Sequence, residues 1–150
     1  MGKLQDELHL DYWALHRWST ENPGDFWSRA WDDLNLIGDK GSVAYQPAPR
    51  FIDAKFFPEA AINVAENLLA HGDGIAIVGI LEDGTRTEIT YSQLREQSAA
   101  VAAAMRQMGI VAGDRVVAWA PNVPEVMIYA LGALSIGAVV STASPDFAPH

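Results

Sequence analysis

The chain has 150 residues, of which 49% are hydrophobic and 19% charged, a balance typical of a folded domain rather than a disordered segment. Its 19 acidic and 10 basic residues give a net charge of −9, which argues against partners such as nucleic acid or an anionic membrane. The absence of cysteine excludes a disulfide framework, a thiolate zinc site and a cysteine nucleophile.

The first part of the chain is rich in tryptophan and is predicted to be helical. We expect one helix over about residues 11–18 and a second that starts at Asn22-Pro23, where Asn22 can accept from a free backbone N–H and proline suits the first turn. Large apolar residues then recur at helical spacing: Phe26, Trp27, Ala30, Trp31 and Leu34. Core packing is the simpler interpretation of this stripe, and an aromatic cage for a ligand is the alternative.

Residues 40–60 are predicted to be loops, and regular elements follow them. We expect a helix over 61–69, a buried strand over 75–81 and a second strand over 85–91, with Asp83-Gly84 as the tight turn of a hairpin. Thr90 and Gln93 have the spacing of a capping box that opens a helix ending at Gly109. The residues expected on its buried face are Leu94, Ser98, Val101, Met105 and Met108.

A strand–helix–strand unit comes next, with strands over 115–120 and 138–142 and a helix over 125–136. The strands are continuous apolar runs, which predicts parallel pairing with helices on both faces. The predicted fold class is therefore α/β: a helical Trp-rich extension, a hairpin and the opening of a mixed sheet. Because a further helix would begin near residues 148–150, we expect the chain to be the front of a larger protein.

The stretch from Val126 to Pro145 carries no charge, and its length is close to the ~20 residues that span a bilayer. Because glycines interrupt it and its second half is β-branched, we interpret it as a buried helix followed by a buried strand. The polar N-terminus does not resemble a secretion signal. We expect a soluble, cytoplasmic protein.

Common catalytic motifs are missing from the sequence. There is no phosphate loop of the form G-x-x-x-x-G-K-[ST], no G-x-G-x-x-G and no G-x-S-x-G nucleophile elbow. The four histidines, His9, His16, His71 and His150, lack metal-ligand spacing. Glu125 suits a helix start better than a catalytic role, and acidic pairs such as Glu82-Asp83 are interpreted as solvated. We predict no catalytic residue and no metal ligand within residues 1–150.

Several stretches, in order over residues 12–149, resemble short-chain acyl-CoA synthetases of the adenylate-forming superfamily. Residues 15–19, Phe26-Trp27, Phe57-Pro58 and 65–69 are similar to the N-terminal extension of that family. Further similar stretches are Thr90-Tyr91 with Leu94-Arg95, Gly113–Val116, Pro121–Glu125 and Gly137–Val139. Residues 51–58 and 144–147 are most similar to the members that activate acetoacetate.

The resemblance implies the N-terminal portion of an ATP-dependent, AMP-forming acetoacetate–CoA ligase. Such enzymes convert a carboxylate to an acyl-adenylate with ATP and Mg²⁺ and then transfer the acyl group to coenzyme A. It implies that residues 1–70 form the helical extension and that residues 71–150 begin an AMP-binding α/β domain, which is incomplete here. Because the phosphate loop and catalytic lysine of the family lie downstream, we expect the 150-residue chain alone to be inactive and to bind none of these cofactors tightly.

One site of the family is expected within the chain. In acetyl-CoA synthetases the loop after the strand that matches residues 138–142 reads Phe-Gly-Gly and approaches coenzyme A. Ser144, Pro145 and Asp146 take those positions here, so they form a possible coenzyme A loop, with a plain loop as the alternative because both glycines are replaced.

Two other functions and one physical property remain as hypotheses. The chain could belong to an acetyl- or propionyl-CoA synthetase, or it could be a stand-alone, non-catalytic binding module. Because the predicted strand over 138–142 needs a partner at each edge, we also expect the isolated chain to self-associate.

Overall fold

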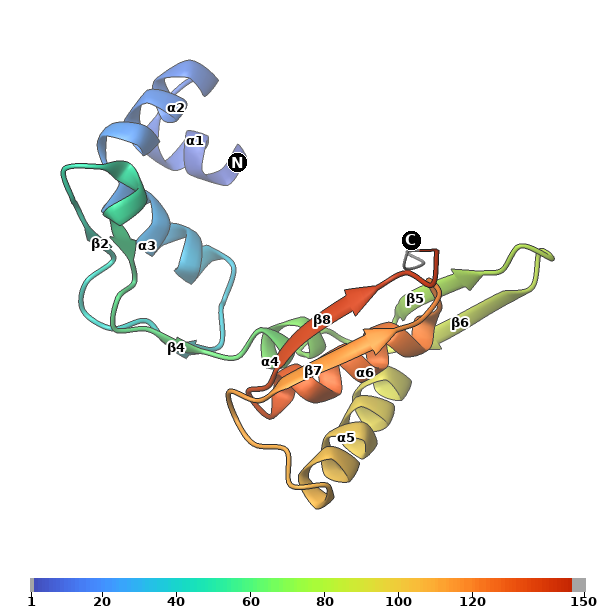
Figure 1. Ribbon diagram of the computed structural model, residues 1–150. Helices are drawn as coiled ribbons and strands as arrows, with labels where there is room; N and C mark the ends of the chain where they lie inside the picture. Colours follow the sequence, from blue (N-terminus) through green and yellow to red (C-terminus); the bar gives the residue numbers. More distant parts are fainter. Residues whose placement is uncertain (1, 147–150) are drawn as a thin grey trace. The chain divides into compact units, whose positions relative to one another are not determined.

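The computed structural model describes residues 2–146, and the chain divides into two compact units (Figure 1). The first unit ends at Ile62 and the second begins at Asn63. Each unit has its own helices and its own paired strands. No helix within residues 2–146 has both the length and the apolar character needed to cross a membrane.

The first unit consists of short helices and very short strands. The helices are α1 (Gly2–Leu8), α2 (Tyr12–Glu21) and α3 (Pro23–Asp33), and a 3-10 turn, η1, covers Phe51–Asp53. The antiparallel pairs are β1 (Gly38–Asp39) with β4 (Ala61–Ile62), and β2 (Tyr45–Gln46) with β3 (Lys55–Phe56). The segment predicted as loop, residues 40–60, therefore contains one strand pair and a 3-10 turn.

The junction between α2 and α3 differs from the prediction in one hydrogen bond. Asp11 caps α2 through a hydrogen bond from the backbone N–H of Ala14 at 2.7 Å. Asn22 makes no such side-chain cap for α3. Its side-chain amide instead donates to the carbonyl oxygen of Trp18 at 3.1 Å, at the end of the preceding helix. The prediction that Asn22 accepts from a free N–H is therefore wrong.

The aromatic stripe on α3 is only partly buried. Trp31 lies in the core, where its ring is 5.1 Å from that of Phe57. Trp27 packs edge-on against Phe56 at 6.1 Å but is about half exposed, and Leu34 is 69% exposed. The stripe thus packs against the aromatic residues of the 51–57 segment rather than against a continuous core.

The second unit contains a hairpin and a strand–helix–strand unit, as predicted. Its elements are α4 (Val64–Leu69), β5 (Ile75–Ile80), β6 (Arg86–Thr90), α5 (Tyr91–Gln107), β7 (Arg115–Trp119), α6 (Pro124–Ser135) and β8 (Val139–Ala143). Strands β5 and β6 pair antiparallel, and β7 and β8 pair parallel without a register shift. The capping box of Thr90 and Gln93 opens α5, and Gly109, with φ of +86°, follows its end.

Two parts of the sheet prediction are wrong for the described residues. The hairpin and the β7–β8 pair form separate two-stranded sheets, so no mixed sheet is present in residues 2–146. Val116 packs in the core with Met105 of α5 and Ala133 of α6, whereas Val117, Trp119 and Val139 are exposed. Helices therefore cover only one face of this sheet. Strand β5 is likewise about half exposed rather than buried.

The helix predicted over 61–69 begins later and packs in the second unit. Residues Ala61–Ile62 pair with β1, and the helix starts after Asn63, whose Oδ1 accepts from the backbone N–H of Ala65 at 2.9 Å. Ala65 is fully buried in a core cluster with Leu94 of α5 and with residues of α6. The predicted domain boundary at residue 70 therefore falls after α4, inside the second unit.

Helices α5 and α6 approach closely through a glycine. A Cβ atom at Gly132 would lie 2.7 Å from Cγ1 of Val101 and 2.9 Å from the carbonyl oxygen of Ser98. Ser98 is buried at this contact, and among the described residues its hydroxyl oxygen has no hydrogen-bond partner. Met108, predicted on the buried face of α5, is 70% exposed because the helix ends there and the chain turns away.

Candidate functional site

The candidate site is a pocket at the carboxyl ends of β7 and β8. In α/β sheets, ligands bind outside the carboxyl ends of parallel strands, where the loops after neighbouring strands diverge. Here the turn after β7 and the loop after β8 meet the tip of the β5–β6 hairpin. The lining residues are Ile80, Leu81, Glu82, Asp83, Pro121, Asn122, Val123, Ser144, Pro145 and Asp146.

The loop after β8 is folded by its own hydrogen bonds. The Ser144 hydroxyl donates to Oδ2 of Asp146 at 3.1 Å, and the backbone N–H of Asp146 lies 3.2 Å from the same hydroxyl oxygen. A serine that bonds two residues ahead in this way forms a tight turn. Pro145 fixes φ within the turn. All three residues predicted as the coenzyme A loop are therefore in this pocket, while Phe147 lies outside the described residues.

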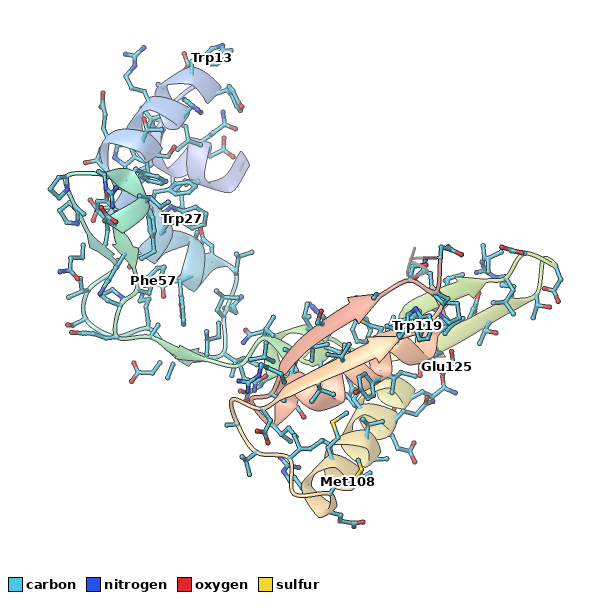
Figure 2. The ribbon with its side chains drawn as sticks, viewed as in Figure 1. Trp13, Trp27, Phe57, Met108, Trp119 and Glu125 are labelled. Carbon is cyan, nitrogen blue, oxygen red and sulfur yellow. The ribbon has the colours of Figure 1, made fainter. Side chains whose placement is uncertain are left out.

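A tryptophan side chain connects this loop to β7. The indole Nε1–H of Trp119, the last residue of β7, donates to the carbonyl oxygen of Ser144 at 3.1 Å. Figure 2 shows Trp119 at the end of the strand. Sequence reasoning did not identify this residue, because its partner is 25 positions away along the chain.

The pocket has an acidic rim. Glu82, Asp83 and Asp146 line it, and none of its lining residues is basic. Hydrogen bonds from Thr85, chiefly from its backbone N–H at 2.8 Å, lower the pKa of Asp83 below its ordinary value, which is itself well below neutral pH. Negative charge disfavours a phosphate in this position and favours a neutral or cationic group. Glu82 and Asp83 are exposed, as predicted, and the hairpin turn brings them to the rim of the pocket.

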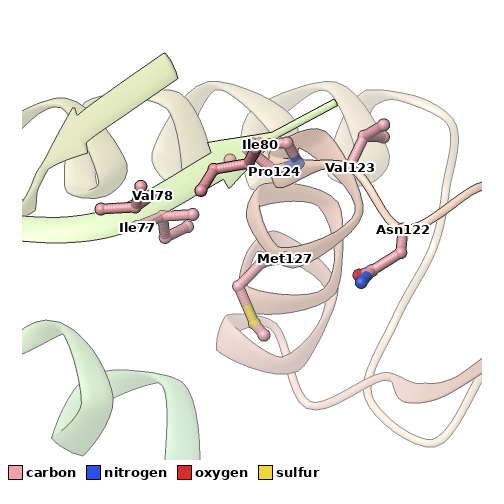
Figure 3. A pocket seen from close by; sticks show the side chains of 8 residues that line it. Ile77, Val78, Ile80, Asn122, Val123, Pro124 and Met127 are labelled. Atoms are coloured by element: carbon pink, nitrogen blue, oxygen red, sulfur yellow. The ribbon is translucent and has the colours of Figure 1, made fainter. Parts of the chain in front are cut away.

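A second pocket, of about 370 Å³, lies between β5 and the start of α6 (Figure 3). Gly79 approaches Pro124 so closely that a Cβ atom there would lie 2.6 Å from Cγ of the proline. Pro124 and Met127 supply the α6 side of the pocket, and Ile80, Asn122 and Val123 line both pockets. Glu125 is exposed in the first turn of α6, as predicted, and lines neither of them.

Two of the three described histidines lie beside aromatic rings, and the third, His9, is exposed. The ring of His16 lies 6.4 Å from that of Trp13, and the ring of His71 lies 5.2 Å from that of Tyr91; His150 is outside the described residues. Within residues 2–146, no group of three or more His, Cys, Asp or Glu side chains could hold a metal ion. Residues 2–146 therefore supply no such cluster of side chains to Mg²⁺.

The aromatic residues of the first unit surround an apolar pocket of about 440 Å³. Its lining residues are Trp27, Trp31, Leu36, Phe51, Phe56 and Phe57. It is where the predicted alternative of an aromatic cage would lie. A specific small-molecule site also needs a few polar groups that orient the ligand, and the polar groups of these six side chains are limited to the indole N–H groups of Trp27 and Trp31.

Two family models match the chain. The model described as "AMP-binding enzyme" matches residues 64–150, and the model described as "Acetyl-coenzyme A synthetase N-terminus" matches residues 12–68. The two ranges overlap over residues 64–68, within α4.

Curated relatives and a solved structure are similar to nearly the whole chain. It is 43% identical over 147 residues to the acetoacetyl-coenzyme A synthetase of Rhizobium meliloti (strain 1021), which covers 97% of this chain and 23% of that protein. It is 36% identical over 143 residues to the acetoacetyl-CoA synthetase of Macaca fascicularis, covering 91% and 21%. The structure of acetoacetyl-CoA synthetase from Streptomyces lividans matches with a TM-score of 0.83 at 30% identity, covering 91% and 22%. The chain thus spans less than a quarter of the length of each.

Proposed function

Because the chain belongs to the AMP-binding enzyme family, we propose that it forms the N-terminal portion of an ATP-dependent, AMP-forming acetoacetate–CoA ligase. The observation that carries the proposal is the similarity to acetoacetyl-CoA synthetases over 91–97% of the chain, in sequence and in structure. The family resemblance predicted from the motifs and the α/β fold class are both confirmed by these comparisons.

The proposed reaction has two steps. A carboxylate oxygen of acetoacetate attacks the α-phosphorus of ATP, and pyrophosphate leaves to give acetoacetyl-adenylate. The sulfur of coenzyme A then attacks the acyl carbon, AMP leaves, and the thiol proton is released. Activation is needed because a thiol cannot displace the oxygen of a free carboxylate until that oxygen belongs to a good leaving group. ATP and Mg²⁺ are cofactors of the whole enzyme in this proposal, and residues 2–146 are assigned no step in the adenylation.

The two units correspond to two roles in the proposed enzyme. The first unit, which the N-terminal family model covers from residue 12, supports the role of helical extension predicted for residues 1–70. The second unit supports the role of an opening AMP-binding domain, predicted for residues 71–150, and α4 belongs to it by contact. Acetoacetate, ATP and coenzyme A are the proposed partners, and a cytoplasmic location fits these soluble substrates.

The pocket at the carboxyl ends of β7 and β8 supports a role for Ser144, Pro145 and Asp146 in the second step. In this loop Pro145 and Asp146 are exposed, and the loop lies at the place where α/β sheets bind ligands. Its acidic rim favours the uncharged pantetheine arm of coenzyme A over the phosphates of the nucleotide. We therefore place the pantetheine arm at this loop.

Pyrophosphate release with ATP, Mg²⁺ and a carboxylic acid tests the proposed function. We expect the 150-residue chain to give no release above the no-enzyme background, and a longer protein that contains this chain to prefer acetoacetate to acetate and propionate. Turnover by the 150-residue chain itself, or a preference of the longer protein for acetate or propionate, would contradict the proposal.

A further inference from the structure

The backbone pairing of β7 and β8 stops just before the proposed coenzyme A loop. Trp119 and Ala143 are register partners at the end of the two strands, and the backbone N–H of Ala120 donates to the carbonyl oxygen of Ala143 at 3.1 Å. Pro121 follows Ala120 after β7, and Pro145 follows Ser144 after β8. Neither proline has a backbone N–H to donate. The parallel ladder therefore has no backbone donor with which to continue into the loop.

The indole of Trp119 supplies the next donor beyond the ladder. Its Nε1–H lies 3.1 Å from the carbonyl oxygen of Ser144, one residue past the last backbone bond. Trp119 is 68% exposed within the part of the chain that the structure describes, so none of those residues fixes its ring by burial. An indole has one hydrogen-bonding group and it is only a donor. The position of the ring and the position of the loop are therefore linked through this single bond.

The same residue of the loop makes the internal turn. Ser144 accepts from Trp119 through its carbonyl oxygen and engages Asp146 through its hydroxyl. The bond from Trp119 thus fixes the start of the turn that carries Pro145 and Asp146 into the pocket.

We propose that Trp119 is a positioning residue for the coenzyme A step: its indole N–H holds the Ser144–Asp146 loop in the conformation that receives the pantetheine arm. The inference rests on the proposed function of that loop. Trp119 itself need not touch the substrate. Without the indole donor the loop samples more conformations, so the affinity for coenzyme A falls while the adenylation of the carboxylate is unaffected.

Substitution of Trp119 in the full-length ligase tests this role. Trp119→Phe keeps an aromatic ring and removes the donor, and we expect the apparent KM for coenzyme A to rise by about 3- to 10-fold, the range that corresponds to one hydrogen bond. ATP–pyrophosphate exchange with acetoacetate should not change. Trp119→Gln returns an amide donor at a similar reach and should recover part of the affinity. Trp13→Phe is the matched control, because Trp13 is similarly exposed, and should leave both measurements unchanged.

The outcomes separate this inference from the proposed function. An unchanged KM for coenzyme A in Trp119→Phe, where Asp146→Arg raises it, overturns the positioning role alone. An unchanged KM in both variants overturns the proposed function of the loop and the positioning role with it. Equal losses in exchange and in thioester formation indicate a folding defect in place of positioning and also overturn the inference.

The hydrogen bond itself can be measured without activity. In the ¹⁵N-labelled 150-residue chain, at a dilution where light scattering shows a monomer, the indole N–H of Trp119 should exchange with solvent more slowly than that of exposed Trp13. Exchange at the same rate would contradict the bond on which the positioning role depends.

Discussion

Asn63 joins the start of α4 to the end of α6, because its side-chain amide donates to the carbonyl oxygen of Leu134 at 3.0 Å. Its Oδ1 accepts from the backbone N–H groups of Ala65 and Glu66. A helix start lacks acceptors for its first N–H groups, and a helix end lacks donors for its last carbonyls. An amide side chain has both, so one residue caps two helices, and the carbonyl group that it caps on α6 lies 71 positions further along the chain.

Substitution of Asn63 should destabilise the second unit. Asn63→Ala removes both caps, and we expect a loss of about 1–3 kcal/mol in the free energy of unfolding, measured with urea. Asn63→Asp keeps the acceptor for α4 but loses the donor for Leu134, so its loss should be smaller. Asn122→Ala, at an exposed position, is the control. Equal stability of wild type and Asn63→Ala would show that the caps contribute nothing.

Local signals account for the elements that could be predicted. Three signals act over only a few residues, and each predicted an element that is present. They are the capping box of Thr90 and Gln93 for α5, the turn at Asp83-Gly84 for the hairpin, and the apolar runs for β7 and β8. Helix α1 carries no acidic residue in its first turn, and it is linked to α3 by an ion pair between Glu7 and Arg29 that no local pattern reveals. The β1–β4 pair joins residues that are more than twenty positions apart.

In the candidate site, too, residues with a local signal were predicted and residues that depend on tertiary contacts were not. Ser144, Pro145 and Asp146 could be placed from the resemblance, because the loop follows a recognisable strand. The sequence did not predict the acidic rim of Glu82 and Asp83 or the hydrogen bond donated by Trp119. These residues reach the loop through tertiary contacts, which no local pattern reveals. The prolines after both strands, Pro121 and Pro145, are the signal that the ladder ends there and that another donor is needed.

Gly132 should not tolerate a side chain. In Gly132→Ala the new methyl group meets Val101 and the carbonyl oxygen of Ser98 at distances below 3 Å, so α5 and α6 must separate. We expect a loss of about 1–3 kcal/mol in the free energy of unfolding, as for other overpacked cores. Gly72→Ala, which has open space around the new methyl group, is the matched control and should be neutral or slightly stabilising. A similar effect at both glycines would contradict the close packing.

Asp146→Arg should impair the thioester step of the full-length enzyme. The long cationic side chain faces Glu82 and Asp83 across the same pocket and can pair with them, which fills the space proposed for the pantetheine arm. We expect the apparent KM for coenzyme A to rise about tenfold, equivalent to 1.4 kcal/mol, while ATP–pyrophosphate exchange is retained. Asp146→Asn keeps the size of the side chain and an acceptor for Ser144, so its effect should be small. Equal effects of the two substitutions would contradict occlusion of the pocket.

Glu59 should titrate below its usual range. Hydrogen bonds from Ser42, first from its backbone N–H and then from its hydroxyl, both at 2.8 Å, lower the pKa of Glu59. A carboxyl group with a lowered pKa stabilises the folded state above its unfolded pKa, and this contribution is lost as the pH falls through the folded pKa. Ser42→Ala removes the hydroxyl and should move the pKa of Glu59 back toward its ordinary value. Carbon-13 NMR titration of the Glu59 carboxyl group measures both, and an unchanged midpoint in Ser42→Ala would contradict the role of the hydroxyl.

The open face of the β7–β8 sheet should cause the 150-residue chain to self-associate. Parallel strands are normally covered on both faces, yet Val117, Trp119 and Val139 are exposed on one face of this pair. Within the described residues both outer edges of the pair also lack a neighbouring strand, and open edges pair readily with other chains. Light scattering at several concentrations should show a mass that rises with concentration. Val117→Lys places a charge on this face and should lower that rise, whereas Val78→Lys, on the separate β5–β6 sheet, should have less effect. A mass that stays monomeric at all concentrations would show that this face needs no cover.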